Sequence, residues 1–179
     1  MKRILVTITI VSCLMMVPAV LSRAEDRPDL DRLLKTKECV RCNLNGVVLP
    51  GVDLSGANLT DSKLKGANLR GANLRGAIFI RSDLSEADLS WTEMNDTKLN
   101  NANLTNANLS MSILRNAAMY EASLRGANLR GADLTSADLR KANLRDIKRL
   151  GMWIRKTDLT GATWIDGRVC APDSISLCR

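Results

Sequence analysis

Cysteine is the residue type in this sequence whose number and spacing point most directly to chemistry. Cys39 and Cys42 are close together, Cys170 and Cys178 form a second close pair, and Cys13 stands alone near the start. Four thiols can hold a tetrahedral zinc ion, a CxxC pair can exchange disulfides, and an even number of cysteines in an exported protein favours disulfide bonds. The choice among these chemistries depends on where the fold places the two pairs.

The other reactive residue types form no catalytic set. Histidine, the commonest general base, is absent from the sequence, and serines such as Ser55, Ser85 and Ser110 have no base at a regular spacing. Acidic residues alternate with asparagine before a regularly spaced leucine, which is typical of a solvated surface. This acidic series comprises Asp53, Asp83, Asp88, Asp133, Asp138 and Asp158. We therefore predict that the protein is not an enzyme and holds no metal or cofactor.

The first 24 residues have the features of a secretory signal peptide. Two basic residues open the chain, an apolar run covers residues 4–21, and small residues precede a cleavage site after Ala24. Polar residues interrupt the apolar run and acids follow it, which favours cleavage over a retained membrane anchor. A lipoprotein with the lipid on Cys13 is a further alternative, although an apolar stretch follows Cys13 where a polar tether is expected.

Export predicts both the compartment and the charge of the mature protein. The full chain has 26 Lys and Arg against 19 Asp and Glu, a net charge of +7. Removal of the signal peptide takes Lys2, Arg3 and Arg23 but no acid, and leaves +4. Such a balance gives loose attraction to anions and says nothing about fold. We expect a periplasmic or otherwise exported protein, with the thylakoid lumen as another such compartment, and no membrane contact after cleavage.

A strict period of five governs residues 42–164. Counted in steps of five from Leu44 to Trp164, 24 of 25 positions are apolar and 19 of them are leucine. Two residues before each of these positions, 21 of 25 residues are small. Ten of the eleven glycines lie two residues after an apolar position. Because the run has no insertion or deletion, we expect it to form one structural unit.

A period of five fits neither a regular α-helix nor a continuous strand. Leucines at this spacing would be spread around a helix and would alternate between the two faces of a strand. A short extended piece followed by a two-residue corner solves both problems. The small residue and the leucine then point inward, the residue between them points outward, and glycine supplies a positive φ at the corner. Repeated corners close the chain into coils that pair through backbone hydrogen bonds.

The repeated units resemble those of pentapeptide repeat proteins. Gly56-Ala57-Asn58-Leu59-Thr60 and the units that begin at Gly66 and Gly126 are similar to the A-(D/N)-L-x-x pattern of that family, and the resemblance covers residues 42–164. It implies an all-β fold, a right-handed quadrilateral β-helix with four pentapeptides per coil. The 25 repeats then make about six coils and a rod about 30 Å long.

Both ends of such a solenoid need a cover. Residues 25–41 predict an N-terminal capping segment, in which Asp29–Lys35 has apolar residues at helical spacing, acids early and a lysine late. Residues 165–179 have lost the repeat and predict a C-terminal cap that contains a disulfide loop and begins with a turn at Asp166–Arg168.

One stretch inside the repeat, residues 147–153, departs from the pattern because Arg149 occupies an inward position. An unpaired charge in the core would be costly. We expect a local bulge in a distorted last coil, with Leu150 taking the inward role. The alternative is a protruding recognition loop that carries Lys148, Arg149 and Trp153.

The length of the expected rod decides which cysteine chemistries are possible. It places Cys39 and Cys42 at one end and Cys170 and Cys178 at the other, so the four sulfurs cannot share one metal ion. The same distance excludes long-range bridges. We therefore expect two local disulfides, Cys39–Cys42 and Cys170–Cys178. A redox-active CxxC motif is the alternative for the first pair.

Four repeats per coil place residues twenty positions apart above one another on the outside of the rod. Basic residues are then spread around the rod and not aligned with aromatic residues, which argues against a nucleic-acid groove. Outward apolar residues are rarer, and three pairs of them stack, which can mark an interface. The pairs are Trp91 with Met111, Ile80 with Tyr120, and Ile113 with Trp153. The candidate interaction surface comprises Trp91, Met111, Ile80, Tyr120, Arg149 and Trp153.

These features predict a non-catalytic structural or protein-interaction module that acts outside the cytoplasm. We expect a monomer or homodimer with an unidentified protein partner and no nucleic acid. One alternative is a DNA mimic that binds a topoisomerase, as some proteins of similar fold do, but that role requires an acidic rod in the cytoplasm. The other alternative is a thiol-redox protein that uses Cys39 and Cys42.

Overall fold

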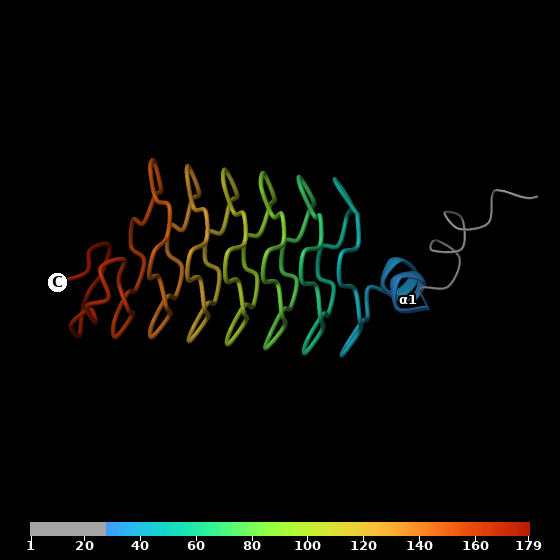
Figure 1. The fold of residues 1–179 in the computed structure, drawn as a ribbon, viewed down its shortest axis with the longest axis horizontal. Coiled ribbons are helices and arrows are strands. Elements are labelled where there is room, and N and C mark those ends of the chain that lie inside the picture. The colour runs from blue at the N-terminus through green and yellow to red at the C-terminus, as the bar shows by residue number, and fades with distance from the viewer. Residues whose placement is uncertain (1–27) are drawn as a thin grey trace, which may run out of the picture.

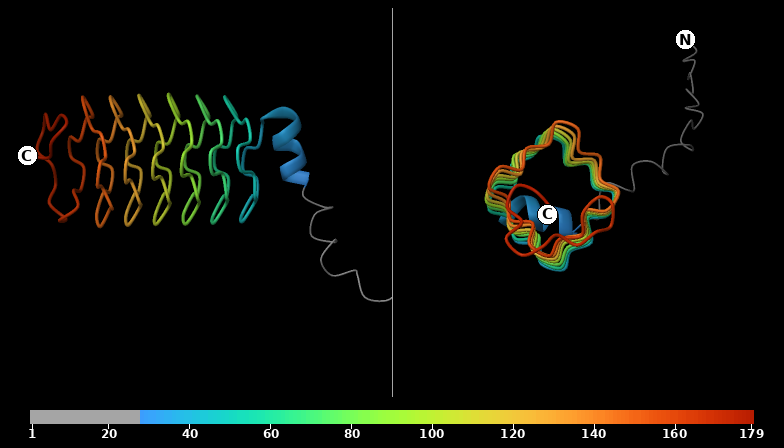
Figure 2. Two further views of the ribbon diagram at one scale, coloured as in Figure 1. Left: turned by 90° about the horizontal axis from the view of Figure 1, so that it is seen from above. Right: turned by 90° about the vertical axis from the view of Figure 1, so that its left-hand side faces the viewer.

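The computed structural model describes residues 28–179, and the predicted signal peptide, residues 1–24, lies outside this range. Helix α1 (Pro28–Thr36) is followed by a stack of coils that runs to the C-terminus (Figure 1). Seen from its end, the stack has a four-sided outline (Figure 2). The chain is therefore a quadrilateral solenoid.

Helix α1 lies at the N-terminal end of the stack (Figures 1 and 2). Its sequence favours a helix because Pro28 occupies the first position, acids lie in the first turn, and Lys35 lies in the last. Leu33 is fully buried and belongs to the same core as the coils. The helix expected over Asp29–Lys35 is present and is one residue longer at each end.

Each coil contains twenty residues. Parallel β-bridges join outward residues twenty positions apart in an unbroken series from Glu38–Asn58 to Asn143–Thr163. On a representative wall, the N–H of Leu59 donates to the carbonyl oxygen of Ile78 at 2.7 Å, and the N–H of Ile78 donates to that of Ala57 at 2.8 Å. The twenty-residue stacking predicted for the outer surface is therefore confirmed.

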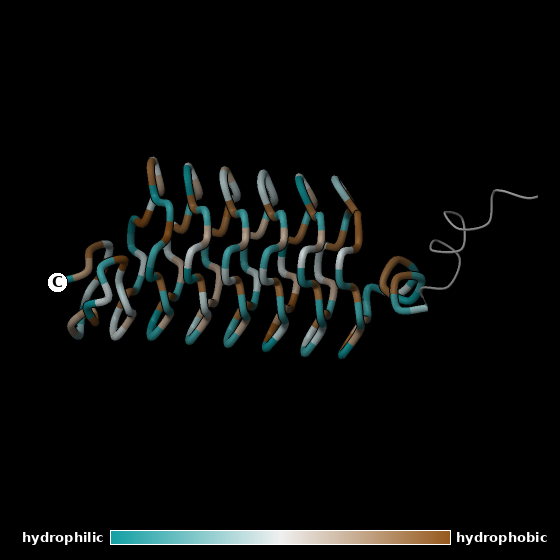
Figure 3. The backbone as a smooth tube through the Cα atoms, viewed as in Figure 1, coloured by the Kyte–Doolittle hydropathy of each residue, from teal (hydrophilic) through white to brown (hydrophobic). Residues whose placement is uncertain are grey.

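Each corner consists of two residues. Across the corner Ser55-Gly56, the N–H of Ala57 donates to the carbonyl oxygen of Leu54 at 3.0 Å. The second corner residue has a positive φ in every repeat as far as Gly161, whether it is glycine or another type such as Asp61. Hydrophilic and hydrophobic positions alternate along the coils (Figure 3) as outward and inward residues alternate. Leucine and alanine fill the interior, where Phe79 is the largest fully buried side chain.

The chain reverses after the last coil. The N–H of Gly167 donates to the carbonyl oxygen of Trp164 at 2.9 Å, and antiparallel bridges then join Thr163 to Val169 and Asp158 to Ile175. The C-terminal segment therefore covers the part of the last coil that contains residues 157–164.

The expected bulge near Arg149 is wrong. The bridges Asn128–Lys148 and Asp133–Trp153 keep the twenty-residue register through this stretch, and Leu150 is 81% exposed and does not point inward. The stretch is no protruding loop either, since its backbone follows the coil below. Arg149 keeps the inward position of the pattern but is exposed, because the C-terminal segment pairs only with residues beyond it.

Candidate interaction surface

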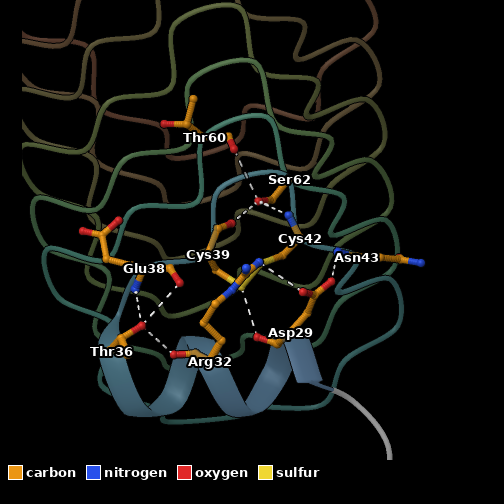
Figure 4. A network of polar contacts seen from close by, with 9 residues as sticks. All are labelled: Asp29, Arg32, Thr36, Glu38, Cys39, Cys42, Asn43, Thr60 and Ser62. Carbon is orange, nitrogen blue, oxygen red and sulfur yellow. Dashed lines mark hydrogen bonds and ion pairs between the residues drawn. A yellow bond between two sulfur atoms is a disulfide. The ribbon is translucent and has the colours of Figure 1, made fainter.

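The cysteine pair Cys39 and Cys42 is enclosed between α1 and the first coil (Figure 4). The two sulfur atoms are 2.05 Å apart, and the residues are at most 1% exposed. Nη2 of Arg32 lies 2.6 Å from Sγ of Cys42, and the carbonyl oxygen of Asp29 lies 3.1 Å from Sγ of Cys39. Disulfide exchange requires an attacking thiolate to reach a sulfur atom, so α1 shields this pair from that reaction.

Polar contacts fasten α1 to the first coil around this pair (Figure 4). The carboxylate of Asp29 accepts a hydrogen bond from the N–H of Asn43 at 2.8 Å and forms an ion pair with Arg32 at 3.1 Å. From the coil side, Oγ of Ser62 accepts a hydrogen bond from the N–H of Cys42 at 3.1 Å. The arrangement holds a helix on a coil and leaves no open reaction centre.

The second cysteine pair anchors the C-terminal segment. The sulfur atoms of Cys170 and Cys178 are 2.09 Å apart, and both residues are buried. The N–H of Gly161 on the last coil donates to the carbonyl oxygen of Cys170 at 3.0 Å. The two pairs therefore belong to opposite ends of the stack, and within residues 28–179 no cluster of three side chains suited to metal binding occurs.

The outward acids are engaged by neighbouring groups. Burial raises the pKa of Asp133, but hydrogen bonds from Thr135 and Arg115 outweigh it and hold that pKa below its usual value; Nε of Arg115 is 2.6 Å from the carboxylate. The hydrogen bond from Arg81 likewise lowers the pKa of Asp61. A general acid near neutral pH needs a raised pKa. These carboxylates have lowered pKa values, so we assign them to holding neighbouring side chains on the outer walls.

Trp91 and Met111 lie on a corner line of unusual composition. Read in steps of twenty, the second corner residues of this line are Gly51, Gly71, Trp91, Met111, Gly131 and Gly151. Trp91 is 55% exposed and Met111 46%, and their φ angles are 62° and 60°. A left-handed backbone costs a non-glycine residue roughly 1–2 kcal/mol, so neither solvent nor backbone favours large apolar side chains here. We call this line, together with the first corner residues beside it and its two adjoining walls, the Trp91 edge.

The Trp91 edge holds most of the exposed apolar surface. Six of the eleven exposed large apolar residues in the described chain belong to it. They are Val48, Trp91, Met111, Ile113, Leu150 and Trp153. The side chain of Met111 extends over Gly131, since a Cβ added at Gly131 would clash with the Sδ of Met111. One of the four edges of the rod thus carries an apolar strip.

Ile80 and Tyr120 lie half a coil away from this edge, and both are half-buried. Nζ of Lys141 donates to Oη of Tyr120 at 2.7 Å, which raises the pKa of Lys141. The guanidinium carbon of Arg140 is 5.7 Å from the centre of the tyrosine ring. Ile80 and Tyr120 therefore lie on a different edge from Trp91, and two cations of the same chain contact the Tyr120 ring.

Arg149 and Trp153, in contrast, come together at the C-terminal end of the Trp91 edge, beside the exposed Leu150. Sequence reasoning left Leu150 out of the candidate surface because it assigned this residue an inward role, whereas the unbroken repeat places it at an outward corner. It also missed the glycine line, although reading the second corner residues in steps of twenty would have found it.

A pocket of about 300 Å³ lies on another edge and is lined by Thr105, Asn106, Arg125, Gly126 and Asp146. Its two charged residues, Arg125 and Asp146, are 3.7 Å apart and pair with each other. The charges of the pocket therefore neutralise each other and leave no unpaired charged group for a ligand. Among residues 28–179, no helix has the length and apolar character needed to cross a membrane.

Several known proteins are similar to this chain. The family described as pentapeptide repeats matches in eight copies, over residues 38–76, 82–119 and 112–148. A pentapeptide repeat protein from the thylakoid lumen of Arabidopsis thaliana is 35% identical, and the match covers 58% of this chain and 70% of that one with a TM-score of 0.54.

Two further solved structures are similar. The pentapeptide repeat protein Rfr23 of the cyanobacterium Cyanothece 51142 is 31% identical over 73% of this chain and 93% of its own, with a TM-score of 0.43. QnrB1, a plasmid-mediated fluoroquinolone resistance protein, is 23% identical over 74% of each chain, with a TM-score of 0.47. Among curated proteins, none matches.

Proposed function

Because this chain belongs to the pentapeptide repeat family, we propose that it is a non-catalytic module that binds a protein partner outside the cytoplasm through the Trp91 edge. One observation carries the proposal. Trp91 and Met111 are large, apolar and exposed at left-handed corner positions, where the same line otherwise has glycine. Such residues add nothing to the repeat, so we assign them to contact with another molecule.

The scaffold suits such a role. Between the two end coils, each wall is bonded to the coils on either side of it, so the edge loses little conformational freedom when it binds, and preorganisation of this kind favours affinity. Aromatic residues and methionine are enriched at protein interfaces. Arg70 lies one coil before Trp91 and Arg130 one coil after Met111, and neither forms an ion pair with another described residue. We therefore expect an apolar partner surface with an acidic rim.

The two other functions considered have less support. A DNA mimic presents acidic groups to its target, whereas this chain has a net charge of +7 and its acids Asp61 and Asp133 are paired with arginine. Thiol–disulfide exchange requires accessible sulfur, whereas Cys39 and Cys42 are buried.

Site-specific photo-crosslinking in the native cell tests the proposal. A photoreactive amino acid at position 91 should capture one protein, and the same group at Asn101, on the opposite edge and also exposed at a left-handed corner, should not. Replacement of Met111 by glycine should reduce capture from position 91. Equal products from positions 91 and 101, or none from position 91, would contradict an interface on the Trp91 edge.

The location outside the cytoplasm has three supports: the signal-peptide features of residues 1–24, the two cysteine pairs at bonding distance, and the similarity to a protein of the thylakoid lumen. Intact mass spectrometry of the protein from its native cell should give a chain that begins at Glu25. Alkylation without reductant should leave Cys39, Cys42, Cys170 and Cys178 unmodified. A chain that retains Met1 and has four free thiols would refute export.

A further inference from the structure

The last coil ends in an open backbone edge over residues 147–154. In this stretch the N–H groups of Arg149, Gly151 and Ile154 and the carbonyl oxygens of Ile147 and Met152 have no backbone partner among the described residues. All five face the end of the stack. They form a row of donors and acceptors of the kind that pairs with an added strand.

The coil below shows what these groups do when they are covered. There the N–H groups of Leu129, Gly131 and Leu134 donate to the last coil at 2.7, 3.0 and 2.8 Å, and the carbonyl oxygens of Ala127 and Ala132 accept from it at 3.0 and 2.9 Å. The open edge therefore has the geometry of a bonded wall with its next layer missing. The C-terminal segment supplies that layer only for neighbouring residues such as Asp158 and Thr163.

The charge of this edge has one sign. Two cations and no acid lie in residues 147–154, and two more cations follow directly. None of the four forms an ion pair with another described residue. They are Lys148, Arg149, Arg155 and Lys156. Elsewhere on the rod cations are often paired, as Arg81 is with Asp61 and Arg140 with Asp138. The edge is thus complementary to acidic side chains.

Apolar side chains accompany the backbone groups. Met152 and Ile154 occupy inward positions but are only partly buried, because no layer lies on them. Trp153 is 62% exposed beside them. An added segment would therefore find hydrogen bonds, an apolar floor and cations within one short stretch.

On these grounds, and resting on the proposed protein-binding function, we propose that the open edge formed by residues 147–154 binds an acidic segment of a partner protein, which follows the corner at residues 150–151 and adds one β-layer to the last coil. The segment pairs its backbone with Arg149, Gly151 and Ile154. It lays apolar side chains on Met152 and Ile154 and directs its carboxylates to the cations of the edge.

Other occupants fit less well. A second copy of this chain, related by a two-fold axis, would place Lys148 and Arg149 near Arg155 and Lys156 of its partner, and like charges disfavour that pairing. A lipid surface or a nucleic acid would satisfy the cations, but neither has the peptide groups that match the row of backbone donors and acceptors.

The test uses two fluorescein-labelled octapeptides as probes, one of alternating valine and aspartate and one of alternating valine and lysine. Fluorescence anisotropy with the mature protein should detect binding of the acidic peptide and not of the basic one, and added salt should weaken it. Equal binding of both peptides, or no binding of the acidic peptide at millimolar concentration, would overturn the proposal.

Ile154→Pro isolates the backbone contribution. It removes one N–H donor of the open edge that has no backbone partner in residues 28–179, and Ile154→Val keeps that donor with a similar side chain. The proline variant should bind the acidic peptide about tenfold more weakly, since one carbonyl of the peptide is left without a hydrogen bond. The valine variant should bind it as the unaltered protein does. Equal affinities for the two variants would exclude strand addition.

Two further measurements apply even if the proline variant fails to fold. Lys148→Glu combined with Arg149→Glu should abolish binding of the acidic peptide, and Arg70→Glu, at an exposed cation elsewhere on the Trp91 edge, should not. In the unaltered protein, hydrogen exchange of the amides of Arg149, Gly151 and Ile154 should slow when the peptide is added. Unchanged exchange at all three amides would exclude the proposed pairing.

The outcomes separate this inference from the proposed function. If crosslinking from position 91 still captures a partner after Ile154→Pro and the charge reversal at Lys148 and Arg149, the Trp91 edge binds without the open edge and only the inference fails. If sedimentation shows a dimer of this chain that Ile154→Pro dissociates, the occupant is a second copy and the inference is wrong.

Discussion

At the scale of single residues, the repeat explains the interior and leaves a few outward side chains unexplained. Trp91 and Met111 occupy backbone positions that favour glycine, and both expose apolar surface to solvent. Asn101, at the equivalent corner position on the opposite edge, is polar. The contrast makes Trp91 and Met111 the residues whose replacement separates binding from stability.

We expect Trp91→Gly to leave the free energy of unfolding unchanged within about 1 kcal/mol. Relief of the left-handed backbone offsets the greater freedom of glycine in the unfolded chain and the lost side-chain contacts. Urea denaturation of the mature protein measures the change, with Asn101→Gly as the matched control. A loss above about 2 kcal/mol would mean that Trp91 supports the fold, which would remove the reason for assigning it to a partner.

The ion pair between Asp133 and Arg115 should make the stability of the protein depend on pH in the acid range. Because the folded protein lowers the pKa of Asp133 below the ordinary 3.8, the stability from this group is present above that value and is lost as the pH falls through the lower folded pKa. Asp133→Asn, which cannot form the charged pair with Arg115, should therefore make the melting temperature less sensitive to pH below about 4. Identical acid profiles for both proteins would contradict the assignment.

At the scale of the elements, the two ends of the stack are covered in different ways. Helix α1 covers the first coil with a buried leucine and with contacts from Asp29 and Arg32. The C-terminal segment covers only part of the last coil with antiparallel bridges and is closed by Cys170 and Cys178. Its attachment depends more on covalent closure, because it adds few buried apolar side chains.

We expect replacement of both Cys170 and Cys178 by serine to lower the free energy of unfolding by about 2–3 kcal/mol, the entropy of closing a loop of this length in the unfolded chain. Amide exchange should rise over residues 157–164, which this segment covers, and not over residues 58–63 near α1. An unchanged exchange rate over residues 157–164 would show that the segment stays attached without the bridge.

The repeated coils and α1 could be predicted from the sequence, whereas the end of the stack could not. The period of five predicted the register and the inward positions, because every coil repeats the same local geometry. The helix α1 was predictable from its own acids, leucines and lysine. The exposure of Leu150 was mispredicted because a bulge was assumed to keep Arg149 out of the core, whereas Arg149 is exposed at the end of the stack with no change of register. The hydrogen bond from Lys141 to Tyr120 was not predictable either, because a long side chain can reach several neighbours.

At the scale of the whole molecule, the proposed binding features share one side of the rod. The Trp91 edge runs along the stack and ends at the open backbone edge, where Leu150 and Gly151 belong to both. A partner with an apolar surface and an adjoining acidic segment could therefore engage the two regions together, and linked contacts strengthen each other. Loss of either region should then weaken binding to the same partner.

Because the register is unbroken, the number of residues between two positions determines whether they face the same side of the rod. Since twenty residues complete one circuit of a four-sided coil, each pentapeptide turns the chain through a quarter of a circle. Removing residues 117–136 would bring the last coil closer to Met111 and keep both on one side. Removing only residues 117–121 would preserve the repeat but rotate Leu150 and Trp153 onto the neighbouring side. If both regions engage one partner, the shorter deletion should disrupt binding more than the longer one, because it changes an angle and not a distance.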